Sequence, residues 1–228
     1  MKVDLIRITE NPVEAIELAA SNCYDSDPTG GKIMEHCYKS GHHSVLEFAE
    51  FHFHIEGVSR TLSHQLVRSR LASFAQRSQR YCSEDGFGYV TPKSILNSKN
   101  IDDAGLTALD YFEGAMEFSQ ESYGNLIDLE IPAEDARFVI SNACETVIDM
   151  KVNLRELMHF MNERLCTCAQ WEIRELANLI RKLVIEKEPK FDKYLVPKCE
   201  KNSPYNFCTE EKKRCCGRQK HISEVLIK

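Results

Sequence analysis

The sequence lacks the features that mark membrane-spanning and secreted proteins. No apolar run approaches the roughly 20 residues that a helix needs to cross a bilayer, although 43 % of the 228 residues are hydrophobic. Residues 1–15 contain no apolar stretch that ends in small residues at a cleavage site, so no secretory signal is expected. With 28 % charged residues, the composition is that of a globular protein. We expect a cytoplasmic protein without a membrane partner.

Acidic residues are missing from residues 57–83, although the whole chain carries a net charge of −6. The same stretch contains five arginines, namely Arg60, Arg68, Arg70, Arg77 and Arg80. Surface helices usually mix charges of both signs, so a site for an anionic ligand explains this stretch better than a solvated helix face. The isoelectric point near 5.8 disfavours the alternative of a nucleic-acid-binding module with an extended basic surface. We therefore expect no nucleic-acid partner.

Paired C-x-x-C motifs, which are typical of zinc sites, are also missing, although the chain has ten cysteines. Six cysteines are dispersed and are expected to be free thiols in a reducing compartment: Cys23, Cys37, Cys82, Cys144, Cys166 and Cys168. The other four crowd the C-terminal tail, at Cys199, Cys208, Cys215 and Cys216. The spacing favours a surface segment with free or oxidisable thiols over a metal site, and we expect no metal.

Helical periodicity outweighs strand periodicity along the chain. The expected helices cover residues 12–21, the segment from the turn at 28–31 to about 40, and residues 58–69, 103–127, 133–148, 153–162 and 169–186. Residues 47–56 alternate as a half-buried strand that Gly57 ends, and 3–9 and 87–92 are candidate partners. The prediction is a single α+β domain over 1–228, in which an antiparallel sheet packs with several long helices. The tail over about 197–228 is expected to be irregular.

Two asparagines are predicted to begin helices. Asn11 precedes Pro12 and Glu14 in a pattern typical of a capping box. Asn153 precedes Glu156 by three residues, which is the spacing of a second capping box. Both helices are therefore expected to start with a side-chain cap.

Residues 63–81, SHQLVRSRLASFAQRSQRY, resemble the signature of flavin-dependent thymidylate synthases. That signature has Arg-His-Arg, then seven residues and a serine, and its counterparts here are Arg68, Ser69, Arg70 and Ser78. Gln65, Arg80 and Tyr81 extend the match. The chain departs from the pattern at Ser69, where the family usually has histidine, and at Phe48, which also replaces a histidine.

Further segments follow the family pattern in the same order. GHHSVLE at 41–47 resembles its G-H-x-S-x-x-E segment, and EDAR at 134–137 matches its E-D-A-R. The C-terminal half of the pattern is matched by Asn153, Leu154, Arg155, His159, Arg164 and AQWEI at 169–173. Because several segments match in order over about residues 40–175, the chain is identified as a member of this family.

The resemblance implies methylation of dUMP to dTMP, with 5,10-methylenetetrahydrofolate as carbon donor and FAD, reduced by NADPH, as hydride carrier. The implied dUMP-binding residues are Gln65, Leu66, Val67, Arg68, Gln76, Arg77, Ser78, Gln79, Arg80, Arg137 and Arg164. The implied FAD-binding residues are His42, Ser44, Arg68, Ser69, Arg70, Gln76, Asn153, Leu154, Arg155 and His159. Arg164 is the implied catalytic residue, because a guanidinium beside the uracil carbonyl stabilises the charge that methylation develops. The family also implies a homotetramer with active sites where subunits meet.

Several of these residues also have plainer interpretations. Ser78 is expected to be a dUMP ligand and not a nucleophile, because its segment offers no base. His52 and His54 are expected at a surface or interface, and Trp171 in the core. Asn153 could act only as a helix cap. The open functional alternatives are another flavoenzyme that acts on a nucleotide without methyl transfer, and a silent relative in which Ser69 marks lost flavin binding.

Overall fold

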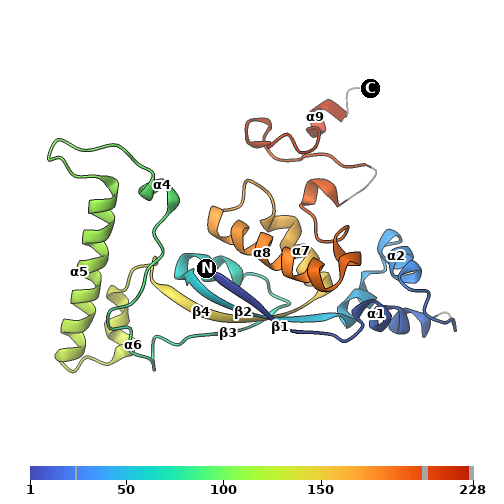
Figure 1. Cartoon of the computed structure of the whole chain (residues 1–228), viewed down its shortest axis with the longest axis horizontal. Helices are drawn as coiled ribbons and strands as arrows, with labels where there is room; N and C mark the ends of the chain where they lie inside the picture. Colours follow the sequence, from blue (N-terminus) through green and yellow to red (C-terminus); the bar gives the residue numbers. More distant parts are fainter. Residues whose placement is uncertain (24, 202–204, 226–228) are drawn as a thin grey trace. The chain divides into compact units, whose positions relative to one another are not determined.

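A four-stranded sheet and several helices confirm the α+β class (Figure 1). The computed structural model describes residues 1–23, 25–201 and 205–225. The strand order is β1-β2-β4-β3, with β1 at Lys2–Ile8, β2 at Glu50–Ser59, β3 at Ser73–Gln76 and β4 at Glu145–Asn153. The N–H of Leu154 donates to the carbonyl of Ala49, and the N–H of Arg60 donates to that of Cys144. The start of β2 therefore pairs with the end of β4, and the two strands run antiparallel.

The helices of the described residues range from single turns to a helix of 21 residues. They are α1 Pro12–Ser21, α2 Lys32–Lys39, α3 Arg60–Leu66, α4 Lys93–Leu96, α5 Ala108–Asp128, α6 Ala133–Ala136, α7 Leu154–Arg164, α8 Trp171–Lys187 and α9 Ile222–Val225. Short 3-10 helices are η1 His43–Phe48, η2 Arg137–Val139, η3 Pro189–Phe191, η4 Lys198–Glu200 and η5 Lys212–Arg214. Of these described helices, none combines the length and the apolar character that a bilayer crossing demands.

The chain divides into two compact units, and the single domain expected over 1–228 stays a prediction. Unit 1 comprises Met1 and residues 56–65 and 75–148, and unit 2 comprises residues 2–55, 66–74 and 149–228. The strands β2 and β4 each contribute residues to both units. In unit 2, α8 packs on β1 and α7 packs on η1 and α8.

The core of unit 2 follows the apolar periodicity of its helices. The fully buried side chains include Ile16 in α1, Leu46 in η1, Leu157 in α7, and Ile173 and Ile180 in α8. The alternating residues Phe51, Phe53 and Ile55 of β2 are buried, as is Ala49 just before the strand, as the strand pattern predicts. The opposite face of β2 carries His52 and His54, which both bond to Asp149 on β4. These histidines therefore serve as surface residues of the sheet.

Glu17 is a buried carboxylate of unit 2 that binds the start of α2. It accepts hydrogen bonds from the backbone N–H groups of Thr29 at 2.6 Å, Gly31 at 2.7 Å and Ile33 at 3.0 Å. Burial by itself raises the pKa of the Glu17 carboxyl, but the backbone donors outweigh it and the net pKa is lowered. A negative charge at this end also complements the dipole of α2.

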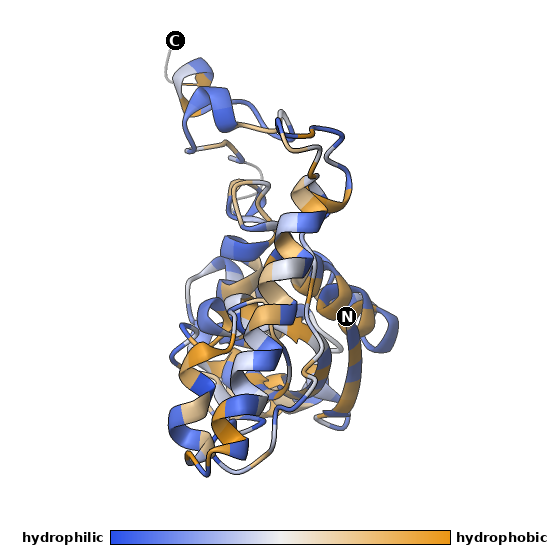
Figure 2. Cartoon of the chain, turned by 90° about the vertical axis from the view of Figure 1, so that its left-hand side faces the viewer, coloured by the Kyte–Doolittle hydropathy of each residue, from blue (hydrophilic) through white to orange (hydrophobic). Residues whose placement is uncertain are grey.

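Unit 1 is organised around α5, which packs against α4, α6 and η2. Tyr123 of α5 is fully buried, and its hydroxyl accepts a hydrogen bond from the N–H of Glu84 at 3.2 Å. Other large apolar side chains are exposed, with 72 % of Phe118, 72 % of Leu129 and 82 % of Phe138 accessible. Figure 2 shows apolar residues alternating with polar ones along this helix. The unit thus presents apolar side chains on its surface.

The helix expected over 133–148 is wrong. The structure has one turn of helix in α6, a 3-10 turn in η2, and then the strand β4. Thr146, Ile148, Met150 and Val152 are buried alternately along β4, which is a period of two. The β-branched residues of this segment suit a pleated surface, so strand packing decides against the helix.

Smaller differences concern the ends of elements. The strand expected over 47–56 begins at Glu50, after η1, and runs through Gly57 to Ser59. Gly57 adopts φ 66°, which glycine tolerates within a strand as an irregularity. The helix expected over 58–69 is shorter, because α3 covers Arg60–Leu66. The helix expected over 103–127 begins at Ala108, where Thr107 and Asp110 form a capping box.

The predicted caps and partner strands have mixed outcomes. Asn153 caps α7 by accepting from the N–H of Glu156, whereas Asn11 adopts φ 45° and makes no side-chain cap. Residues 3–9 are confirmed as a strand by β1. Residues 87–92 are not a strand: they form one isolated bridge, at Tyr89, and are otherwise irregular up to α4. The tail from 197 is largely irregular with short turns, and its residues 202–204 and 226–228 lie outside the described residues.

Candidate functional site

Glu134 brings two of the predicted phosphate-binding arginines together in unit 1. The Nε and Nη2 atoms of Arg80 lie 3.0 and 2.9 Å from one oxygen of the Glu134 carboxylate. The Nε of Arg137 donates to the backbone carbonyl of Glu134 at 3.0 Å. The spacing of one helical turn between Glu134 and Arg137 places both on the same side of α6 and η2. Glu134 belongs to the EDAR motif at 134–137, but the motif alone does not indicate that it pairs with Arg80.

The other arginines of unit 1 surround the buried carboxylate of Glu84. The Nε of Arg77 lies 3.3 Å from that carboxylate, and an Nη atom donates to the carbonyl of Ser83 at 3.1 Å. Arg60 donates to the carbonyl of Arg77 at 3.1 Å, and its buried Nε has no hydrogen-bond partner among the described residues. Burial raises the pKa of the Glu84 carboxyl, while Arg77 and Arg60 oppose the shift. The Arg77 side chain is thus engaged within the protein.

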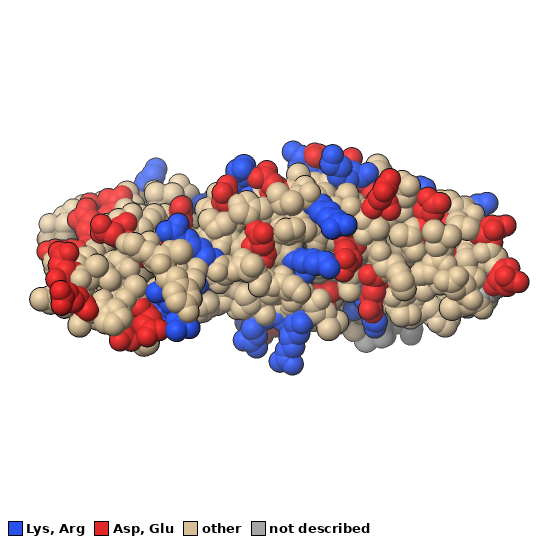
Figure 3. All heavy atoms as spheres, turned by 90° about the horizontal axis from the view of Figure 1, so that it is seen from below, with Lys and Arg blue, Asp and Glu red and all other residues tan. Residues whose placement is uncertain are grey.

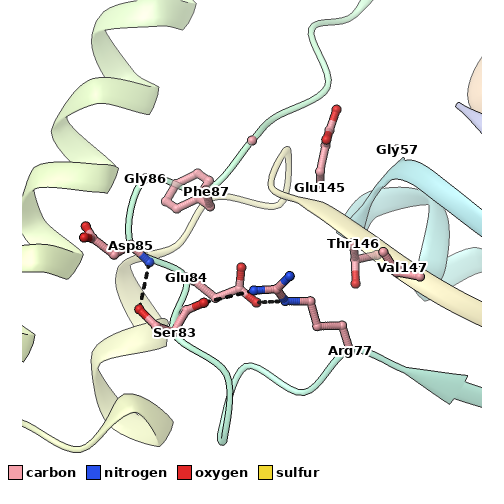
Figure 4. Close-up of a pocket in the computed structure, with 11 residues that line it drawn as sticks. Gly57, Arg77, Ser83, Glu84, Asp85, Gly86, Phe87, Glu145, Thr146 and Val147 are labelled. Carbon is pink, nitrogen blue, oxygen red and sulfur yellow. Dashed lines mark hydrogen bonds and ion pairs between the residues drawn. The ribbon is translucent and has the colours of Figure 1, made fainter.

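A pocket of about 260 Å³ lies beside this pair. Figure 4 shows the Arg77 guanidinium directed at Glu84, with Thr146 and Val147 of β4 across from it. The loop from Ser83 to Gly88 forms the other wall. The pocket is lined by the carboxylates of Glu84, Asp85 and Glu145, and its one arginine, Arg77, is already paired with Glu84.

The segment around Ser78 is held by hydrogen bonds to the rest of unit 1. The amide of Gln76 donates to the hydroxyls of Ser63 at 3.0 Å and Thr146 at 3.2 Å. Gln79 donates to the sulfur of Cys144 at 3.7 Å. The Ser78 hydroxyl accepts from the N–H of Arg80 at 3.2 Å and contacts no histidine or carboxylate of the described residues at hydrogen-bond distance. Gln65 is partly buried at the end of α3.

The largest described pocket of unit 2, of about 870 Å³, gathers residues assigned to FAD. Arg155 and His159, one turn apart on α7, line it together with Gly41 and His43 of the upstream motif. Leu71 also lines the pocket, shortly after the Arg-x-Arg motif. The Nη1 of Arg155 lies 2.6 Å from a carboxylate oxygen of Glu47, so the guanidinium is held at the rim.

Aromatic and basic groups that the sequence analysis did not select complete this pocket. Tyr38 stacks on His43 with ring centroids 5.3 Å apart, and both line the pocket beside Lys39. A pocket of this size falls within the range of about 300–1,000 Å³ that cofactor sites occupy. The periodicity of α2 could have identified Tyr38, because it lies one turn after the buried Met34, whereas exposed Lys39 gives no such signal. The donor set and the rings fit a phosphorylated aromatic cofactor.

The remaining residues assigned to FAD differ in exposure. Leu154 is buried beneath the start of α7, and the Asn153 side chain is occupied as the cap. His42 and Ser44 are exposed at the start of η1. Leu154 therefore supports the helix, while His42 and Ser44 are accessible to a ligand.

The arginines of unit 2 that carry the strongest functional assignments make no ion pair with described residues. Arg68 and Arg70 lie in the turn after α3 and are exposed, with Ser69 between them bonding to the carbonyl of Leu66 at 3.1 Å. Val67 is exposed and Leu66 is buried. Arg164 is the last residue of α7 and is partly buried, also without a described partner. These guanidinium groups retain their capacity for an anionic ligand.

The structure therefore distributes the predicted residues over two groups. Unit 1 holds the residues assigned to the dUMP phosphate, with Arg80 and Arg137 at Glu134. Unit 2 holds most residues assigned to FAD, with Arg155 and His159 in one pocket, and it also holds Arg164. That the two groups serve one active site stays a prediction.

Comparisons with known proteins agree with these motifs. Residues 4–190 match the family described as thymidylate synthase complementing protein. A flavin-dependent thymidylate synthase of Geobacter sulfurreducens is 44 % identical over 197 residues, covering 81 % of this chain and 82 % of the relative. One of Clostridium tetani is 36 % identical and covers 100 % of this chain and 97 % of the relative. One of Pyrococcus furiosus is 37 % identical over 78 % of this chain and 76 % of the relative.

Proposed function

Because the chain belongs to the thymidylate synthase complementing protein family and is a flavin-dependent thymidylate synthase, we propose that it methylates dUMP to dTMP with 5,10-methylenetetrahydrofolate as carbon donor. FAD, reduced by NADPH, is the proposed hydride carrier. The observation that carries the assignment of residues is the meeting of Arg80 and Arg137 at Glu134. Arg80 contacts the side-chain carboxylate and Arg137 the backbone carbonyl of the same residue, and two such guanidinium groups could bind one phosphate dianion.

The proposed phosphate site uses an exchange of anions. Glu134 holds the Arg80 fork in the orientation in which a bidentate anion would bind. The Glu134–Arg80 pair is half exposed, so breaking it costs little free energy. The dUMP phosphate replaces the carboxylate at Arg80, with Arg137 as a second donor. The backbone of residues 76–80, fixed by Gln76 and Gln79, frames the nucleotide.

Arg164 is the proposed catalytic residue. Carbon–carbon bond formation at C5 of uracil needs electron density at that atom, and negative charge develops on the ring carbonyl and N3. A guanidinium next to these atoms stabilises this charge in the transition state. Its position at the end of α7, without a described partner, leaves its donors available for the base.

The pocket of unit 2 is the proposed FAD site. Arg155 and His159 would bind its anionic or polar groups, and exposed Arg68 and Arg70 would pair with its phosphates. When bound, the flavin supplies hydride chemistry that protein side chains lack. The residue between the arginines, Ser69, can donate one hydrogen bond where the family usually has an imidazole. We expect this change to alter flavin affinity and not the type of reaction.

Self-association into a homotetramer is the proposed assembly. Exposed Phe118, Leu129 and Phe138 of unit 1 support it, because apolar side chains of this size are usually covered in an oligomer. On the face drawn in Figure 3, acidic and basic side chains are intermingled. This mixture favours protein and small-molecule ligands over nucleic acid. The cytoplasmic location stays a prediction.

A product assay tests the proposed function. Purified protein is incubated with dUMP, methylenetetrahydrofolate, NADPH and FAD, and dTMP is measured by chromatography with each component omitted in turn. We expect dTMP only in the complete mixture. NADPH oxidation that depends on dUMP but yields no dTMP would instead assign the alternative, a nucleotide-binding flavoenzyme without methyl transfer. A purified protein that binds no added FAD would indicate the silent relative.

A further inference from the structure

The cysteines near the C-terminus gather in unit 2 although they are far apart in the sequence. Six of the ten cysteines lie in the connection between α7 and α8 or in the tail: Cys166, Cys168, Cys199, Cys208, Cys215 and Cys216. All six are free thiols. The proposed function uses none of them, and the tail lies beyond residue 190, where the match to the family model ends. A separate explanation is therefore needed for their convergence.

The first pair of thiols comes from the connection between the helices. The sulfur atoms of Cys166 and Cys168 and a carboxylate oxygen of Glu210 all lie within 4.8 Å of one another. Thiolates that share one tetrahedral zinc ion, with Zn–S bonds of about 2.3 Å, lie about 3.8 Å apart. The separation is thus close to that of two ligands of one metal ion.

The second pair comes from the tail. Cys208 is buried, and the sulfur of Cys215 lies 3.8 Å from the carbonyl oxygen of Gln219. Cys166, Cys208 and Cys215 line one small cavity, together with Cys199 and Cys216. The N–H of Gly217 donates to the sulfur of Cys215 at 3.5 Å. Hydrogen bonds of this kind stabilise a thiolate and orient it as a ligand.

The tail has almost no apolar core of its own. Among the described residues from 198 to 225, Cys208 is the one buried side chain, with 6 % of its surface accessible. Figure 2 shows mainly hydrophilic residues in the segment that leads to the C-terminus. Even so, the backbone of Cys208 pairs with that of Lys220 and Ile222 at 2.8 Å. A short polar segment that folds in this way usually depends on a metal ion or on disulfides.

The charges around the cavity suit a metal bound by thiolates. Lys198, Arg214 and Arg218 line the same cavity. A zinc ion with four thiolates carries two negative charges, which these cations offset. Glu210 pairs with Lys198, and its carboxylate lies within 4.8 Å of the Cys168 sulfur, so it can accept a hydrogen bond next to the four sulfur ligands.

We propose that Cys166, Cys168, Cys208 and Cys215 bind one Zn²⁺, which fastens the tail to the end of α7. Four sulfur ligands select zinc among the abundant divalent ions and give a closed, structural site. On binding, each thiol loses its proton to water, four Zn–S bonds form, and the ion gives up its bound waters. Cys216 is exposed, and it stays outside the ligand set.

Metal analysis of the full chain tests the zinc site. Protein purified without chelator is analysed by inductively coupled plasma mass spectrometry, and we expect about one zinc per chain. X-ray absorption at the zinc edge should give four sulfur neighbours at about 2.3 Å. The Cys208→Ser and Cys215→Ser variants should lose the zinc and melt at lower temperature. Matched controls are Cys216→Ser, which alters a neighbouring thiol of the same cavity, and Cys23→Ser, both of which should keep it.

Several results would overturn the proposal. Protein without zinc whose mass is lowered by the hydrogens lost in disulfides would show that the thiols pair with one another. Iron with a brown colour would show an iron–sulfur cluster. If the variants do not fold, replacement of zinc by Co²⁺ in the wild-type protein gives a second reading, because four thiolates produce an intense sulfur-to-cobalt absorption. A spectrum without that band would contradict a four-sulfur site. None of these readings depends on thymidylate synthesis.

Discussion

The two units treat their arginines differently. In unit 1, Arg80 and Arg137 are bonded to Glu134, and Arg77 is bonded to Glu84. In unit 2, Arg68, Arg70 and Arg164 make no ion pair with described residues. The arginines of unit 1 are therefore oriented before a ligand arrives, and a ligand must displace what holds them. Arg155 of unit 2 is likewise paired, with Glu47, whereas the proposed ligand itself would order Arg68, Arg70 and Arg164, at a cost in side-chain entropy on binding.

The two units also differ in the pKa of their buried carboxylates. Glu17 of unit 2 is bound by neutral N–H donors, and its pKa is lowered despite burial. Glu84 of unit 1 is buried beside Arg77, yet burial dominates and its pKa is raised. The backbone donors at 2.6 to 3.0 Å thus outweigh the effect of burial on the pKa of Glu17, whereas Arg77 at 3.3 Å and the charge of Arg60 do not outweigh it at Glu84.

The largest expected effect concerns Arg164. Arg164→Ala should lower kcat for dTMP by about a hundredfold or more, because a donor that acts on developing charge is lost. The dissociation constants for dUMP and FAD should change far less. Steady-state kinetics and calorimetry measure the two quantities, and Lys182→Ala, an exposed charge on α8, serves as control. Equal losses in dUMP affinity and kcat would make Arg164 an ordinary binding residue.

The next effect concerns the oriented arginines. Arg80→Ala should weaken dUMP binding by about 10- to 100-fold, since each hydrogen bond to a charged group contributes about 1.5–3 kcal/mol. Binding of deoxyuridine, which has no phosphate, should not change. Calorimetry with both ligands measures this, with Lys99→Ala as a control for loss of charge in unit 1. A parallel loss for deoxyuridine would exclude Arg80 as the phosphate ligand.

The third effect concerns FAD binding, which should weaken when Arg155 of unit 2 is replaced. Arg155→Ala should weaken FAD binding by about tenfold, because it removes a charged donor from the pocket. Glu47→Gln removes the carboxylate partner and leaves the guanidinium in place, so its effect should be smaller. Quenching of flavin fluorescence measures both variants. If the two variants lose affinity equally, Arg155 acts by shaping the pocket and not by binding the cofactor.

Glu17→Gln should lower the free energy of unfolding by about 1–3 kcal/mol at pH 7, because charged acceptors bind N–H groups more strongly. The folded state has the lower pKa, so this stabilisation is present above the ordinary carboxyl pKa of 4.5 and is lost as the pH falls through the folded value. Urea unfolding at neutral and acidic pH should show the difference shrinking with acid. The control Glu14→Gln, at an exposed position of the same helix, should leave the free energy of unfolding unchanged at neutral and at acidic pH.

The smallest effect concerns Glu134. Glu134→Gln should tighten dUMP binding a few-fold, because the phosphate no longer competes with a carboxylate for Arg80. The gain should fade at high salt, which screens exposed pairs. Calorimetry at two salt concentrations measures it. Weaker dUMP binding in the variant would indicate that Glu134 positions Arg80, and that its carboxylate does not compete with the phosphate for Arg80.

Much of the fold follows from local patterns. The alternation in β2 and the apolar stripes of α1, α7 and α8 are visible in the sequence because each buries one face. The prediction of a helix over 133–148 is wrong, because the alternation of buried Thr146, Ile148 and Met150 lies in a stretch that contains both helix-favouring and strand-favouring residues. Its neighbours in the sheet decide its conformation, and they are remote in sequence.

The sequence by itself determined the family and the residues with chemical capacity, because motif spacing and the absence of acids in 57–83 are properties of the linear chain. It also fixed which faces of most helices are buried. Tertiary structure alone decided that Glu134 holds Arg80 and Arg137, that Tyr38 completes the pocket of Arg155, and that Cys208 and Cys215 meet Cys166. These contacts join residues on separate elements, and their distances depend on how the chain folds back on itself, which no local pattern records.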